Sequence, residues 1–159
     1  MFKYLLLSSI LMSQSIGPTA DFDKLKNKLQ ESGFEVNIAV PPDVRLPKQQ
    51  IDFQRRRLRK PYGLLDVNNR SIWINPIVFE LGIDRSVLIH ETVHAAQFCR
   101  GNGSLQALEL DIEPIKQARP FFKRYVDPHG RTLEREAYTV QTQNNSYELA
   151  MSLLDKYCK

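Results

Sequence analysis

Two histidines four residues apart, with a glutamate directly after the first, are the residues of this sequence best suited to chemistry. They are His90, Glu91 and His94, in the run HETVH. On a helix, positions i and i+4 lie on one face, so two imidazole nitrogens can reach the same metal ion. Glu91 would lie beside that metal, where it can take a proton from metal-activated water and pass it to a leaving amine. The spacing predicts a zinc site held by His90 and His94, with Glu91 as general base.

The residues around the motif favour this metal site over an ordinary surface helix. The flanking residues are uncharged: Val87, Leu88, Ile89, Thr92, Val93, Ala95 and Ala96. A buried helix needs such flanks, because a desolvated charge without a partner is costly. The alternative is two hydrogen-bonded histidines with Glu91 facing solvent, which leaves an acid in an apolar run unexplained.

The helix that carries the motif has clear start and stop signals. Asp84 is a good N-cap residue, and helical spacing follows from about Arg85 to Cys99. Gly101 and Gly103 then favour its end, since glycine commonly follows the last helical turn. We therefore expect one continuous helix to present both histidines on the same face.

The motif in this setting resembles the zincin metallopeptidases, over roughly Ile72 to Gln141. The metzincin extension is absent, because Gln97 stands where its glycine would be and Arg100 where its third histidine would be. The resemblance is therefore to the gluzincins, in which a downstream helix supplies a glutamate as third ligand. The matching segment here is LEREAY, residues 133–138. In related gluzincins the ligand glutamate lies three residues before a small alanine, as Glu134 does.

Helical spacing also favours Glu134 over Glu136 as the third ligand. Glu134 shares a face with Ala137, Tyr138 and Gln141. The small Ala137 would let this helix approach the histidine helix closely. Glu136 faces elsewhere, with Thr139 and Val140, and remains the alternative ligand.

The sequence departs from the gluzincin pattern at Tyr138, where related proteins carry an aspartate that orients a ligand histidine. A phenol can still donate or accept a hydrogen bond there. Stabilising the oxyanion of the transition state usually needs a further His, Tyr or Arg near the metal. The candidates are His129, Tyr125, Tyr138 and Tyr147.

The first twenty residues have the order of a secretory signal. Lys3 precedes a short apolar run from Leu5 to Met12, and small and turn-forming residues follow as far as Ala20. The run is too short to span a bilayer, so we expect no stable membrane span. We predict a signal peptide over residues 1–20, with a cut after Ser15 as a second possibility, and a secreted or periplasmic protein.

The two cysteines fit the same compartment. Cys99 follows the metal motif and Cys158 is the penultimate residue. In an exported chain an even cysteine count favours a disulfide. A bond between them would tie the C-terminal helix to the end of the motif helix. The alternative is two unpaired cysteines, one of them buried.

The remaining pattern predicts a single α+β domain over residues 21–159, a minimal zincin-like fold. It has a small sheet, the active-site helix and a C-terminal helical part. The expected elements are a helix over 21–32, a strand over 34–40, a long loop over 41–62, hairpin strands over 63–67 and 71–75, short helical pieces within 104–126, and helix from 132 to 158 with a break near 144. The strand over 71–75 is expected either as a sheet edge that could hold an extended peptide or as a core strand.

The composition of the chain does not indicate what the protein binds, so the expected partner follows from the HETVH motif. The chain has a formal net charge of +4, with 42% hydrophobic and 25% charged residues, as an ordinary globular protein has. Much of the charge lies in one cluster, Arg55 to Lys60, which we interpret as a solvated loop. Nucleic-acid binding through this cluster is a less favoured hypothesis for the function of the protein. We expect a peptide or protein substrate and no nucleic acid, with the oligomeric state left open. The alternative to a zinc peptidase is a non-catalytic zinc-binding or interaction module.

Overall fold

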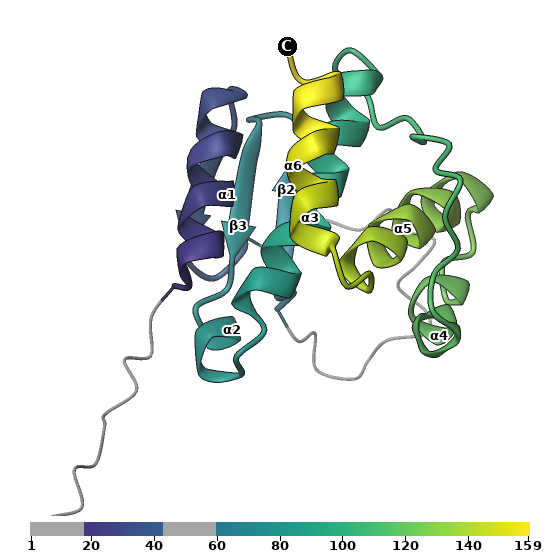
Figure 1. Ribbon diagram of the computed structural model, residues 1–159, viewed down its shortest axis with the longest axis horizontal. Coiled ribbons are helices and arrows are strands. Elements are labelled where there is room, and N and C mark those ends of the chain that lie inside the picture. The colour runs from purple at the N-terminus through teal and green to yellow at the C-terminus, as the bar shows by residue number, and fades with distance from the viewer. Residues whose placement is uncertain (1–17, 43–59) are drawn as a thin grey trace, which may run out of the picture.

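The computed structural model describes residues 18–42 and 60–159. Most of the predicted signal segment and the arginines of the Arg55–Lys60 cluster lie outside the described residues. The described chain has the predicted α+β organisation, with a small sheet and a larger helical part (Figure 1).

The sheet has three strands in the order β1-β3-β2: β1 (Glu35–Ile38), β3 (Ser71–Ile74) and β2 (Gly63–Asp66). The predicted hairpin is confirmed, since β2 pairs antiparallel with β3. The expectation that β3 could form the sheet edge is wrong, because β1 pairs with its other side in parallel. Among the described residues, β1 and β2 are therefore the two edge strands, and β3 is the central strand.

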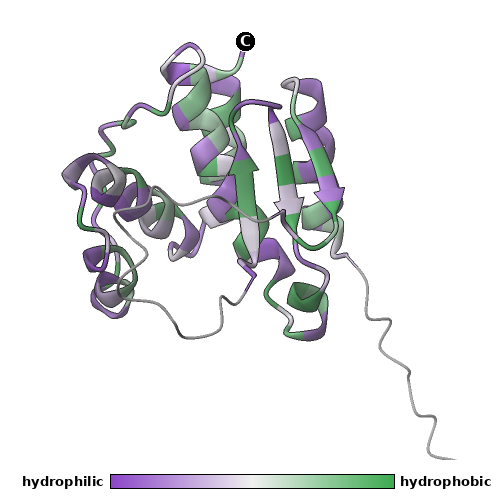
Figure 2. Cartoon of the chain, turned by 180° about the vertical axis from the view of Figure 1, so that it is seen from behind, coloured by the Kyte–Doolittle hydropathy of each residue, from purple (hydrophilic) through white to green (hydrophobic). Residues whose placement is uncertain are grey.

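Three helices lie on one side of this sheet, as Figures 1 and 2 show from opposite sides. They are α1 (Ala20–Glu31), α3 (Asp84–Arg100) and α6 (Ser146–Tyr157). Two of them, α1 and α3, contact the strands, and α6 packs against both of these helices. The predicted apolar positions of α1 are all buried: Phe22, Leu25 and Leu29. The side chains of Ile72 and Ile74 in β3 are fully buried and belong to the same core cluster.

The first helix begins within the segment assigned to the signal. Thr19 is the N-cap of α1, and its hydroxyl accepts a hydrogen bond from the backbone N–H of Phe22 at 3.3 Å. A cut after Ala20 would remove this cap, whereas a cut after Ser15 would keep it. Ser32 and Gly33 follow the helix, and Gly33 has a φ of 85°, which glycine adopts without strain.

The motif helix α3 lies at the centre of the molecule and is buried along most of its length. Its predicted N-cap is wrong: Asp84 is the first helical residue, the cap position is Ile83, and no side-chain cap bond forms. A carboxylate in the first turn still interacts favourably with the helix dipole. Gly101 is the C-cap, as the glycine pattern predicted. Burial by several neighbours explains why its flanks are uncharged.

The remaining helices are α2 (Ile77–Glu80), the 3-10 turn η2 (Lys116–Ala118), α4 (Arg119–Lys123) and α5 (Pro128–Gln141). The predicted break near residue 144 is confirmed, because α5 ends at Gln141 and α6 begins at Ser146. The capping box expected for α6 does not form, since Asn145 makes no side-chain cap bond. Instead α5 starts earlier than predicted, because Asp127 caps it by accepting from the Gly130 N–H.

The predicted disulfide joins Cys99, in the last turn of α3, to Cys158 at the end of α6, with a Cα–Cα distance of 5.2 Å. It therefore holds the C-terminal helix against the central one. Disulfides of this kind form and persist mainly in oxidising compartments. Among the residues that the structure describes, no helix has the length and apolar character needed to cross a membrane.

Candidate metal centre

Three potential ligands from two helices converge at the middle of α3. His90 and His94 come from α3, and Glu134 comes from α5, which packs against it. The Nε2 atoms of the two histidines lie 3.2 Å apart. The carboxylate of Glu134 lies 3.3 Å from Nε2 of His90 and 3.5 Å from Nε2 of His94. These three groups could hold a metal ion.

The spacing of the three ligands fits a small tetrahedral cation. With zinc–ligand bonds of about 2.0–2.1 Å, two ligand atoms of a tetrahedral site lie about 3.3 Å apart. The three separations here, 3.2, 3.3 and 3.5 Å, match that edge length. The close approach depends on Ala137, whose side chain is fully buried one turn after Glu134. A small residue at this position was predicted to serve that purpose.

A glutamine determines which ring nitrogen of His94 is free. The Oε1 atom of Gln97 lies 2.7 Å from Nδ1 of His94. The amide nitrogen of the same Gln97 donates to the carbonyl of Leu133 and to Glu136, so its oxygen must face the histidine. His94 therefore donates through Nδ1–H, and its Nε2 carries the lone pair that faces the other two ligands.

His90 has a corresponding partner, because its Nδ1 lies 3.0 Å from Oε1 of Gln141. The gluzincin resemblance placed Tyr138 in this role, but Tyr138 instead packs its ring against His90, with the centroids 4.7 Å apart. Both histidines thus direct lone-pair nitrogens towards each other and towards a carboxylate. Such a set of donors requires a proton or a metal cation at its centre.

The close packing of these ligands shifts the pKa values of His94 and Glu134. Burial lowers the pKa of His94, but the carboxylates of Glu134 and Glu91 outweigh burial and raise that pKa to about 9. Burial raises the pKa of Glu134, but hydrogen bonds from the two histidines hold it well below its usual value. A proton on His94 would therefore compete with a cation that bound among these three groups.

Glu91 lies beside this group and is buried, so the alternative with Glu91 facing solvent is wrong. Burial raises the pKa of its carboxyl group, while the backbone N–H of Leu65 in β2 donates a hydrogen bond that opposes this rise. The neighbouring Gly63 leaves the necessary space, because a methyl group there would lie 2.5 Å from Oε1 of Glu91. The edge strand thus orients the predicted base.

Glu136, the alternative third ligand, points away from the metal group. Its carboxylate accepts hydrogen bonds from the backbone N–H groups of Leu108 and Glu109, each at 2.7 Å. It also accepts from the amide of Gln97 at 2.9 Å. The face that Glu134 shares with Ala137 is thus the one turned towards the histidines, as helical spacing predicted.

The aromatic candidates for oxyanion stabilisation divide into two groups. Tyr138 contacts His90, and the negative charge of Glu134 contributes, after burial, to raising the pKa values of both Tyr138 and Tyr125, the latter to about 12. His129 instead hydrogen bonds the carbonyl of Leu105. Tyr147 packs against the guanidinium of Arg85. Tyr125 and Tyr138 are therefore the two candidates on the side of the metal group.

Three residues of the site were not predicted from the sequence: Gln97, Gln141 and Gly63. Gln97 lies three residues after His94, and Gln141 shares the face of Glu134, so helical spacing could have indicated both. Gly63 had no such signal, because its contact with Glu91 depends on how β2 packs against α3.

Comparison with protein-family models gives no match for this chain, and comparisons with curated proteins and with solved structures give none either. The fold and the site together define an α+β protein with a His-His-Glu group that could hold a metal ion.

Proposed function

We propose that this protein is an exported zinc-dependent hydrolase, a gluzincin-like peptidase. The observation that carries the proposal is the position of Glu91, a buried carboxylate beside three converging ligands. A site that only holds a fold together needs no base, and a buried acid without a function is costly.

In the proposed hydrolysis, the metal would activate water and the protein would transfer the proton. Zinc, when bound by His90, His94 and Glu134, supplies a Lewis acid that lowers the pKa of water. Glu91 accepts the proton of the attacking water at its carboxylate and returns it to the leaving nitrogen. Burial supports this role, because it raises the pKa of Glu91 above its usual value and so makes the carboxylate a stronger base.

Among the described residues, no strand pairs with the outer side of β2, and this edge is the best candidate for holding an extended peptide. Strand addition needs unpaired backbone groups at a sheet edge, and β2 is the edge strand on the side of Glu91. A peptide lying along β2 would pass next to the base. This replaces the earlier expectation for β3, which has a partner strand on each side.

The metal content of the purified protein tests the proposal first. After dialysis without chelator, mass spectrometry should find about one zinc per chain, as a three-ligand site implies. A folded sample that takes up no stoichiometric metal, even after reloading with zinc, would contradict the proposal.

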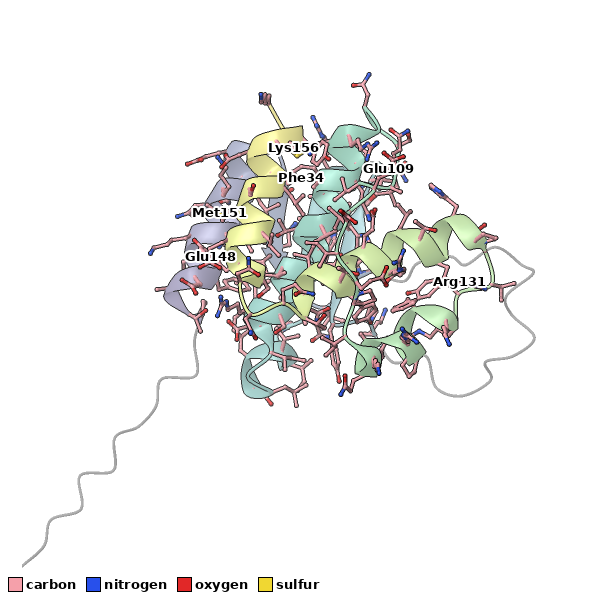
Figure 3. All side chains as sticks on the ribbon, turned by 45° about the vertical axis from the view of Figure 1, so that its right-hand side comes forward. Phe34, Glu109, Arg131, Glu148, Met151 and Lys156 are labelled. Atoms are coloured by element: carbon pink, nitrogen blue, oxygen red, sulfur yellow. A yellow bond between two sulfur atoms is a disulfide. The ribbon has the colours of Figure 1, made fainter. Side chains whose placement is uncertain are left out.

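The second test is the Glu91→Gln variant, assayed on a mixture of peptides. It should retain zinc and fold but lose hydrolysis by about 100-fold or more, because the base is gone. Glu148→Gln is the matched control, since Glu148 is exposed on α6 (Figure 3) and should leave activity unchanged. Metal binding without hydrolysis in the unaltered protein would favour the non-catalytic zinc module.

A further inference from the structure

Glu136 is a buried acid for which the proposed chemistry has no use. Its side chain is only 5% exposed, and among the described residues it forms no ion pair within salt-bridge distance. Its charge is instead satisfied by hydrogen-bond donors. These are the N–H groups of Leu108 and Glu109 at 2.7 Å, that of Leu110 at 3.4 Å and the amide of Gln97 at 2.9 Å.

The loop that contributes these N–H groups has an unusual backbone at its centre. Glu109 has a φ of 58°, a left-handed conformation that is uncommon outside glycine, asparagine and aspartate. Backbone of this kind can turn successive N–H groups towards one anion. Glu109 also pairs with Arg100 near the end of α3, where Figure 3 labels it. The loop is therefore shaped around the Glu136 carboxylate.

A continuous hydrogen-bonded path leads from this loop to a metal ligand. Glu136 accepts from the amide nitrogen of Gln97, which is fully buried. That bond, together with the bond to the carbonyl of Leu133, directs the oxygen of Gln97 to Nδ1 of His94. If the amide of Gln97 turned over, its nitrogen would face His94, and the lone pair of the ring would move to Nδ1.

We propose that Glu136 is a positioning residue of the metal centre, which acts through Gln97 to hold His94 in its ligand tautomer while it anchors the 108–110 loop. This inference rests on the metal site of the proposed function. The carboxylate is needed because it has only acceptor atoms. A glutamine at position 136 would keep only one acceptor oxygen. Its amide nitrogen would therefore lie against N–H donors, either those of Gln97 and Leu108 or those of Glu109 and Leu110.

The test measures zinc affinity by competition with a chromophoric chelator, using the full chain and the variants Glu136→Gln and Gln97→Ala. Each should weaken zinc binding about 10–100-fold, the usual effect of losing a group that orients a ligand. The double variant, which combines Glu136→Gln with Gln97→Ala, tests whether Glu136 acts through Gln97. Since Glu136 acts through Gln97, Glu136→Gln should weaken binding little further once Gln97 is alanine.

A spectroscopic measurement separates positioning from general loss of structure. In the zinc-loaded protein, nitrogen–proton spectra of the imidazole rings should show the Nδ1–H of His94 and of His90. Glu136→Gln should alter the His94 signal and spare that of His90, whose partner is Gln141. Glu109→Gly is the matched control, because it keeps the backbone N–H and suits a φ of 58°.

Three results would overturn the inference while the proposed function stands. They are zinc affinity within twofold of the unaltered protein for Glu136→Gln, additive effects in the double variant, and equal changes at both histidines. If the unaltered protein binds no zinc, the proposed function itself fails.

Discussion

At the residue scale, the group formed by His90, His94 and Glu134 can hold either a proton or a metal cation. His94 and Glu134 face each other among buried groups, and each shifts the other towards its charged form. A metal that binds between them must displace the proton from the histidine, because a ligand imidazole is neutral. Metal binding and protonation therefore compete for the same space.

This competition predicts opposite pH dependences for the two forms of the protein. In the metal-free form, the pKa of His94 is raised to about 9 from about 6.5, so its contribution is complete below pH 6.5. The contribution is lost as the pH rises through 9, and the free energy of unfolding should fall by on the order of 3 kcal/mol. Zinc affinity should rise over the same range, because protonation no longer competes.

Urea unfolding at pH 6 and pH 9 checks this prediction, once with chelator and once with excess zinc. The metal-free protein should be more stable at pH 6, and the gain in stability from zinc should be larger at pH 9. The variant His94→Gln should reduce both differences. Equal metal-free stability at the two pH values would contradict the assigned cause.

At the scale of elements, the site depends on two close approaches to α3. On one side Ala137 lets α5 bring Glu134 to the histidines. On the other side β2 lies against Glu91, where Gly63 has no side chain to occupy the space of the carboxylate. Gly63 is not among the glycines with a positive φ, so its backbone conformation does not require glycine. The absence of a side chain matters because it leaves space for the carboxylate of Glu91.

The variant Gly63→Ala should therefore impair the base and spare the metal. Its new methyl group would lie 2.5 Å from Oε1 and 2.8 Å from Cγ of Glu91, so the carboxylate must move. We expect hydrolysis to fall about 100-fold, within the range for loss of a general base, with zinc content unchanged. Kinetics and metal analysis of the same preparation check both parts.

Gly82→Ala is the control for this variant, since a methyl group there meets nothing within 4 Å. Its φ of 64° means that alanine costs some stability, about 1 kcal/mol, without contact with the site. Loss of zinc in Gly63→Ala, or full activity, would show that Gly63 does not act by making room for Glu91.

At the scale of the whole molecule, a small sheet and one central helix hold the core together. The disulfide closes a loop with a sequence separation of 59 between Cys99 and Cys158. It anchors α6 over α3, close to the C-terminus. Chain-entropy arguments give such a cross-link about 4 kcal/mol of stability, a large share of the total for a domain of this size.

The double variant Cys99→Ser, Cys158→Ser should lose roughly that free energy of unfolding, and its zinc content should equal that of the unaltered protein. The reason is that the cross-link restrains mainly the unfolded chain, whereas the three ligands are held by the packing of α3 against α5. Urea unfolding and metal analysis of both proteins check this. Loss of zinc at full folding would mean that the disulfide shapes the site itself.

Local spacing in the sequence determined much of this protein. Four features were predicted because each depends on residues a few positions apart. They are the i, i+4 spacing of the histidines, the face of α5 that carries Glu134, the hairpin and the break before α6. The cysteine pairing was predicted from the expected compartment and the even count. Helix starts were predicted less well: Asp84 and Asn145 have the right residue types for caps but form no cap bonds.

Only the tertiary structure decided the surroundings of the site. The central position of β3 depends on its pairing with β1, across a long connection that no local pattern encodes. The contacts of Glu136 with the 108–110 loop span 26 to 28 residues, and Gln97 reaches 39 residues to Glu136. Gly63 meets Glu91 only when β2 packs on α3. Helical and strand periods specify the face on which a side chain lies, but its partner depends on how the elements pack in space.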